Sequence, residues 1–187
     1  MYDLQYYSNL FAHLHTAKRF GRPAPHKAIL LLSVIDLVEN GTIKSPHIPL
    51  SDELIKAFDD NWKRYLGALK LFTPDICKPF YHMQHEPFWC LREKEEAYSM
   101  MAAESSPTLH NAEKKDLPQG RYTAKAMRSA FCWAEIDPAL FHLLQNQESR
   151  GHLRVILIST YLQNQPIGNG NIGAFGVVST LFYLLAS

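Results

Sequence analysis

A short cationic segment, Arg22–Lys27, has the clearest capacity for chemistry in this chain of 187 residues. Arginine, histidine and lysine stand there beside two prolines, directly before an apolar run that predicts a buried helix over about residues 25–39. Ala24 and Pro25 offer no capping side chain, so the first backbone N–H groups and the helix dipole can meet an anion such as a phosphate. A water-capped helix start at the surface is the alternative.

Basic residues cluster in two places, although the formal net charge of the chain is only +1. The first cluster falls within residues 18–27 and contains no acid, and the second falls within 114–128 and contains one acid, Asp116. Local basic patches can bind a polyanion on a nearly neutral protein, but either patch alone is equally typical of a solvated surface. The basic residues are Lys18, Arg19, Arg22 and Lys27 in the first cluster, and Lys114, Lys115, Arg121, Lys125 and Arg128 in the second.

Residues 79–91 form an aromatic-rich block that predicts a β-hairpin, with two short strands around a turn at 84–87. Alternation along a strand sends some of these side chains inward, and we expect Phe80 and Trp89 in the core. Tyr81 or His82 could then stack on a ligand or form a hydrogen bond with it, although core packing is the more common role for either residue.

The chain lacks the local signatures of common catalytic and metal sites. It has no Gly-x-Ser-x-Gly or His-Glu-x-x-His motif, and Cys77, Cys90 and Cys132 show no Cys-x-x-Cys spacing. The glycine-rich segment 168–176 has no lysine and no strand–helix frame, which indicates a turn instead of a phosphate-binding loop. We therefore expect no catalytic residue, no metal and no cofactor.

Hydrophobic periodicity predicts a mainly α protein, a single compact helical domain over residues 1–187 with a small β-hairpin at about 79–91. Residues 42–50 favour an extended segment, and the polar residues 92–120 favour one short helix with loops. The turn at 168–176 precedes an apolar segment at 177–186. The expected helices cover residues 3–19, 25–39, 52–69, 122–135, 138–146 and 148–162.

The composition, with 47% apolar and 20% charged residues, is that of a soluble protein. The first residues lack the basic and apolar regions of a signal peptide. The longest apolar stretch, 175–186, is shorter than the roughly 20 residues that a membrane helix needs. Cysteines without a disulfide framework fit a reducing compartment. We therefore expect a cytoplasmic protein without a membrane partner.

Three blocks of the chain resemble the sulfur-binding domains of McrA-type HNH restriction endonucleases, which attack phosphorothioated DNA. Residues 24–43 are similar to the family's signature of Ala-Pro-His-Lys, an apolar run and Gly-x-Ile. Residues 79–91 look like its aromatic block, and residues 137–162 look like its closing segment. The blocks follow the family's order over most of residues 2–162, and the first is the most specific.

The resemblance implies a domain that recognises double-stranded DNA in which sulfur replaces one non-bridging phosphate oxygen. Sulfur is larger, more polarisable and less hydrated than oxygen, so an apolar cup at Pro23–Pro25 with a cationic rim would favour it. The DNA- and sulfur-binding residues would then be Arg22, Pro23, Ala24, Pro25, His26, Lys27, Tyr81 and His82, and contacts to flanking phosphates would come from Lys18, Arg19, Arg121, Lys125 and Arg128.

Two features depart from the family. The HNH nuclease motif that usually follows this domain in the enzymes is not found, so the resemblance implies a binding module that serves modification-dependent restriction together with an HNH nuclease domain or partner. The family commonly continues Tyr-Phe-Pro where this chain has Tyr161-Leu162-Gln163.

Two other functions stay open on the sequence. The basic clusters alone fit a general DNA-binding or regulatory domain without a preference for sulfur. His82, His85 and nearby acids could instead serve a metal-dependent hydrolase. The sequence predicts neither the preferred DNA context and stereoisomer nor the oligomeric state.

Overall fold

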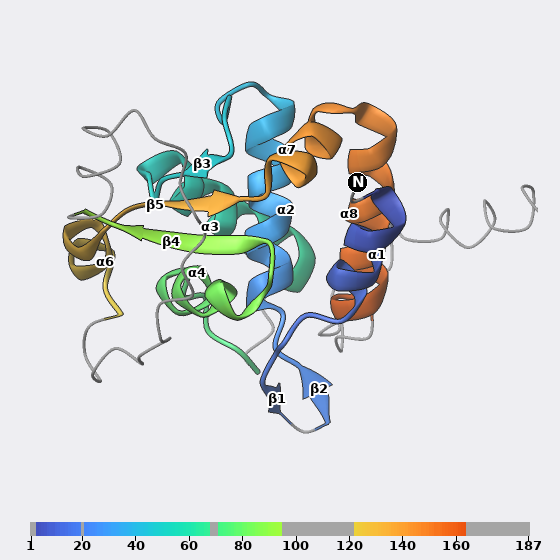
Figure 1. The fold of residues 1–187 in the computed structure, drawn as a ribbon. Coiled ribbons are helices and arrows are strands. Elements are labelled where there is room, and N and C mark those ends of the chain that lie inside the picture. Colours follow the sequence, from blue (N-terminus) through green and yellow to red (C-terminus); the bar gives the residue numbers. More distant parts are fainter. Residues whose placement is uncertain (1–2, 20, 68–70, 95–121, 164–187) are drawn as a thin grey trace, which may run out of the picture.

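The computed structural model describes residues 3–19, 21–67, 71–94 and 122–163, and helix α2, His26–Glu39, runs through its centre (Figure 1). Eleven of the 14 residues of α2 are buried, because the helix is apolar on nearly every side. The helix ends at Asn40, and Gly41 follows with a positive φ of 75°, which glycine adopts readily. The predicted buried helix over about 25–39 is confirmed.

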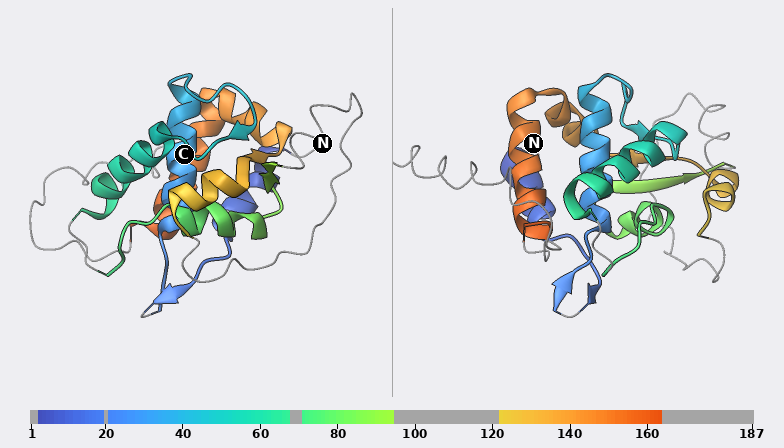
Figure 2. Two further views of the ribbon diagram at one scale, coloured as in Figure 1. Left: turned by 90° about the vertical axis from the view of Figure 1, so that its left-hand side faces the viewer. Right: turned by 180° about the vertical axis from the view of Figure 1, so that it is seen from behind.

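Four further helices build the rest of the helical body, which confirms the predicted mainly α fold (Figures 1 and 2). Three of them pack directly against α2, and α1 (Leu4–Ala12) packs on α8 (Gln147–Tyr161). Asp3, Ser51 and Asn146 each cap a helix by accepting a first-turn N–H. The other two helices are α3 (Asp52–Leu66) and α7 (Pro138–Gln145).

A three-stranded antiparallel sheet completes the core. Its order is β3–β5–β4, with bounds His47–Ile48, Phe131–Ile136 and Trp89–Glu93. The central strand, β5, pairs with both neighbours, so residues far apart in the chain meet there.

The predicted hairpin over 79–91 is wrong. Cys77–His82 forms helix α4, Met83–His85 continues as the 3₁₀ helix η1, and an extended strand begins only at Trp89. Cys77, Phe80 and Tyr81 have the i, i+3, i+4 spacing of one helix face, and all three are buried. β4 pairs with β5, and not with the segment before the predicted turn.

The predicted helix over 122–135 is wrong in its second part. Helix α6 covers only Ala124–Ala130, and β5 begins at Phe131. Ala134 and Ile136 are buried on one face of β5, which is the period of a strand. Aromatic residues such as Trp133 favour a strand over a helix, which explains where α6 ends.

The predicted helix over 3–19 is also shorter in the structure. After α1 the chain leads into a two-stranded antiparallel hairpin, β1 (Lys18–Arg19) and β2 (Arg22–Pro23). Gly21 lies in the turn with a φ of 74°, a conformation that glycine allows. The sequence predicted a stiff loop here, not a hairpin.

Several predictions lie outside the described residues. These are the turn at 168–176, the apolar segment at 177–186, most of the polar segment 92–120, and the basic residues Lys114, Lys115 and Arg121. Within the described part of the chain, no helix is both long and apolar enough to cross a lipid bilayer.

Candidate functional site

The β1–β2 hairpin projects from the body of the protein beyond the start of α2 (Figures 1 and 2). Lys18 pairs with Pro23, and Arg19 lies directly opposite Arg22. Two like charges at opposed positions destabilise a strand pair. An anion bound at the hairpin would offset this repulsion.

Arg22 has an unsatisfied donor. Its Nη1 atom is buried and has no hydrogen-bond partner among the described residues. Arg19 differs, because its Nη1 donates to the backbone oxygen of Leu71 at 2.9 Å. A buried donor without an acceptor is unfavourable, so this nitrogen is a candidate for a contact with an anionic group.

The apolar part of the predicted cup is smaller than expected. Pro23 and Ala24 are half-buried, whereas Pro25 is buried and so contributes little surface to a ligand. The N–H of Ala24 donates to the oxygen of Ala17 at 2.7 Å, which holds this backbone against the residue that precedes β1. Pro25 is the N-cap of α2 and makes no side-chain capping bond, as the sequence indicated.

Lys27 does not reach the surface, which corrects the prediction that it meets a phosphate. Its side chain is 7% exposed, and Nζ lies 2.5 Å from Oε1 of Glu86, whose side chain is 2% exposed. Glu86 also accepts from the backbone N–H of His15 at 3.0 Å, and its Oε2 lies 3.2 Å from His15 Nδ1. The three residues lock the start of α2 to the loop after α1 and to the end of η1.

His26 acts as a neutral hydrogen-bond donor and not as a cation. This corrects the prediction that it adds positive charge at the rim of the cup. Nε2 lies 2.9 Å from the backbone oxygen of Thr73. The centroid of the ring lies 4.8 Å from that of Trp62 and 5.8 Å from that of Phe72. Burial lowers the pKa of His26 from its usual value, although the hydrogen bond to Thr73 opposes the shift. The ring therefore supports the corner formed by the β1–β2 hairpin and the start of α2, and it adds little positive charge there.

Tyr81 and His82 have different environments. Tyr81 is buried, and its ring packs against Tyr122 at 5.7 Å and Phe131 at 6.0 Å, so the prediction that it stacks on a ligand is wrong. His82 is half-buried and stacks on the exposed His85 with ring centroids 5.8 Å apart. Of the two, only His82 keeps the predicted place at the surface.

Of the second basic cluster, Lys125 and Arg128 lie on α6. Helix α4 lies between α6 and the hairpin in every view (Figures 1 and 2). Arg128 donates to the oxygen of Leu50 at 2.7 Å, and its Nη2 lies 2.5 Å from Asp52 Oδ1. Much of its charge is therefore matched within the protein. Lys125 is exposed, and Arg121 lies outside the described residues.

Glu86 is the site residue that the sequence analysis missed. It lies 59 positions from Lys27 in the chain, within the segment 84–87 that was predicted as a turn. The one available signal is a lone acid within an aromatic block, because a buried carboxylate needs a cation or several donors.

No group of three or more metal-ligating side chains occurs within the described ranges. A comparison of the chain with protein-family models gives no match. A comparison with curated proteins likewise gives no match.

Proposed function

We propose that the corner formed by the β1–β2 hairpin and the start of α2 binds the backbone of double-stranded DNA and prefers a phosphorothioate linkage. The observation that carries the proposal is the buried, unpartnered Nη1 of Arg22 beside the half-buried Pro23 and Ala24. A guanidinium fits an anionic phosphate group with directed hydrogen bonds. Lys18 and Arg19 on the same hairpin add positive charge, and the hairpin carries no acid.

The preference for sulfur rests on the two apolar residues next to this donor. Pro23 has no N–H, and the N–H of Ala24 already donates to Ala17. A non-bridging oxygen placed against them would lose water without gaining a hydrogen bond, whereas a sulfur loses less hydration and gains dispersion contacts. Arg22 would hold the remaining charge of the same linkage.

Rigidity supports such discrimination. The buried pair of Lys27 and Glu86 and the bond between Ala24 and Ala17 hold the corner before a ligand arrives. A site that is already ordered loses less conformational entropy on binding. Lys27 therefore has a positioning role in place of the predicted contact to phosphate.

The proposed DNA contacts extend from the hairpin toward α4 and α6. His82 on α4 is half-buried and Lys125 on α6 is exposed. In Figure 2, α4 lies nearer to the hairpin and α6 lies beyond it. Phosphate contacts of this kind position a duplex without reading its sequence. The module would act in the cytoplasm beside an HNH nuclease that cleaves the marked DNA.

The test is a gel-shift titration of one duplex with and without a single phosphorothioate, using each stereoisomer. We expect one stereoisomer to bind at least about tenfold more tightly than the unmodified duplex. Arg22→Gln should lower the affinity for the modified duplex by about tenfold or more. Lys56→Gln removes an exposed lysine of α3 that pairs with Asp60, and it should change neither affinity.

A second function is binding of the DNA backbone without a preference for sulfur. It is favoured because Pro25 and Lys27 are buried and offer little surface to a ligand at the corner. It predicts equal affinity for the modified and unmodified duplexes, with both lowered by Arg22→Gln. The same titration therefore separates the two functions.

A further inference from the structure

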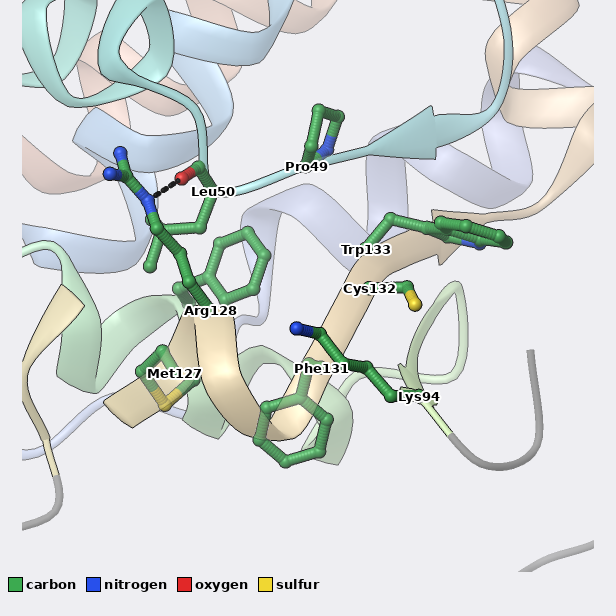
Figure 3. Close-up of a pocket in the computed structure, with 9 residues that line it drawn as sticks. Pro49, Leu50, Lys94, Met127, Arg128, Phe131, Cys132 and Trp133 are labelled. Carbon is green, nitrogen blue, oxygen red and sulfur yellow. Dashed lines mark hydrogen bonds between the residues drawn. The ribbon is translucent and has the colours of Figure 1, made fainter. Parts of the chain in front are cut away.

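A pocket of about 380 Å³ lies beside α6, between the sheet and the segment that leads into α3 (Figure 3). Its volume is within the usual range of small-molecule sites. Leu50, Phe80 and Met127 form apolar walls, and Phe131 and Trp133 from β5 add aromatic ones. Aromatic rings and a methionine sulfur favour a planar apolar ligand.

The described residues that line this pocket include two cations. Lys94 and Arg128 line it, and no acid is among the described residues that do so. Arg128 donates to Leu50 and Asp52, whereas Lys94 has no ion pair with any described residue. Among the described residues, Lys94 is therefore the lining cation without an acid partner.

A strand irregularity places Lys94 over the pocket. The pairing of β4 with β5 shifts register between Arg92 and Glu93, so Glu93 lies opposite Phe131. Such bulges redirect the side chains that follow them. Figure 3 shows the Lys94 side chain extending across the pocket between Arg128 and Cys132.

The wall also contains an unused donor. Trp133 stacks on His47 with ring centroids 4.8 Å apart, and its Nε1 is buried without a hydrogen-bond partner among the described residues. The Trp133 nitrogen is covered by the protein, so the Lys94 ammonium is the donor that an acceptor oxygen of a ligand can reach at this pocket.

We propose that this pocket binds a small aromatic molecule that carries one carboxylate or a similar anionic group. The ring would lie among Phe131, Trp133 and Met127, and the anion would meet Lys94. This site is separate from the proposed DNA-binding corner, and its ligand does not depend on that function.

The experiment is calorimetric titration of the full chain with 2-naphthoate and with its neutral isostere, 2-naphthamide. We expect the carboxylate to bind about tenfold more tightly than the amide, because the charge-assisted contact to Lys94 is available only to the anion. Lys94→Gln should remove this difference and leave the affinity for the amide unchanged. Lys44→Gln, an exposed lysine outside the pocket, is the matched control and should change nothing.

A thiol measurement locates the ligand. Cys132 lines the pocket, and in a chain with Cys90→Ser, bound 2-naphthoate should slow the modification of Cys132 by N-ethylmaleimide several-fold. No binding of 2-naphthoate, equal affinity for acid and amide, an unchanged preference in Lys94→Gln, or no protection of Cys132 would each overturn the proposal. Thermal melting of each variant verifies that it is folded.

Discussion

Nζ of Lys27 and Oε1 of Glu86 form a buried ion pair at 2.5 Å, and it joins the first turn of the central helix to the end of η1. Both charges are almost fully removed from water, so each depends on the other for stabilisation. The pair fixes where the β1–β2 hairpin leaves the body of the protein, because β2 is followed directly by the start of α2.

The first prediction concerns this pair. Lys27→Met should lower the free energy of unfolding by about 3–5 kcal/mol, because it leaves the Glu86 carboxylate buried without a cation. Adding Glu86→Gln should recover a large part of the loss, since the neutral amide can still accept from the N–H of His15. Urea denaturation measures both variants. A loss below about 1 kcal/mol for Lys27→Met would show that the charge pair is not buried as described.

The second prediction concerns the opposed arginines of the hairpin. Arg19→Gln removes one of two like charges that face each other, so the free energy of unfolding should stay within about 0.5 kcal/mol of wild type or rise slightly. The same change should reduce the slope of log affinity for DNA against log salt concentration by about one. An unchanged salt slope would mean that Arg19 makes no phosphate contact.

The third prediction concerns pH. The pKa of His26 is lowered in the folded protein by burial, so the unfolded chain, with a pKa near 6.5, binds the proton more readily. The contribution of His26 to stability is therefore complete above about pH 6.5 and decreases as the pH falls from there toward the lower folded pKa.

The matched variant is His26→Gln, which keeps a donor for the Thr73 oxygen and cannot be protonated. Below pH 6.5 the wild type should lose unfolding free energy relative to the variant, by at most about 1.4 kcal/mol per pH unit. Denaturant titrations at several pH values measure it. A difference that does not vary with pH would contradict a neutral, half-buried ring.

The sequence predicted those elements whose signals are local. The apolar run of α2 with Asn40 and Gly41 at its end gave both its burial and its boundary, and Ser51 gave the start of α3. These features depend on neighbouring residues only, so no knowledge of the fold was needed.

The errors arose where tertiary contacts decide the structure. Residues 77–82 have a helical face and an aromatic composition typical of strands, and burial of Phe80 and Tyr81 beside α2 favours the helix. β5 is extended between its partners β4 and β3, and these approach it only through the fold. A short aromatic segment is therefore ambiguous until its partners are known.

The candidate site was predicted in part. Arg22, Pro23 and Ala24 were named from their order in the chain, and they lie together at the surface. The inward direction of Lys27 could not be predicted, because its partner Glu86 approaches only through the fold. A lysine in a first helical turn looks the same in sequence whether it faces solvent or a buried acid.

The most direct test of the account is competition between a duplex with one phosphorothioate and the same duplex without it, measured for wild type and for Ala24→Asp. The account predicts that the wild type prefers the sulfur-bearing duplex at least about tenfold and that the acid at position 24 abolishes the preference. Equal affinity of the wild type for the two duplexes, with either stereoisomer, would contradict it.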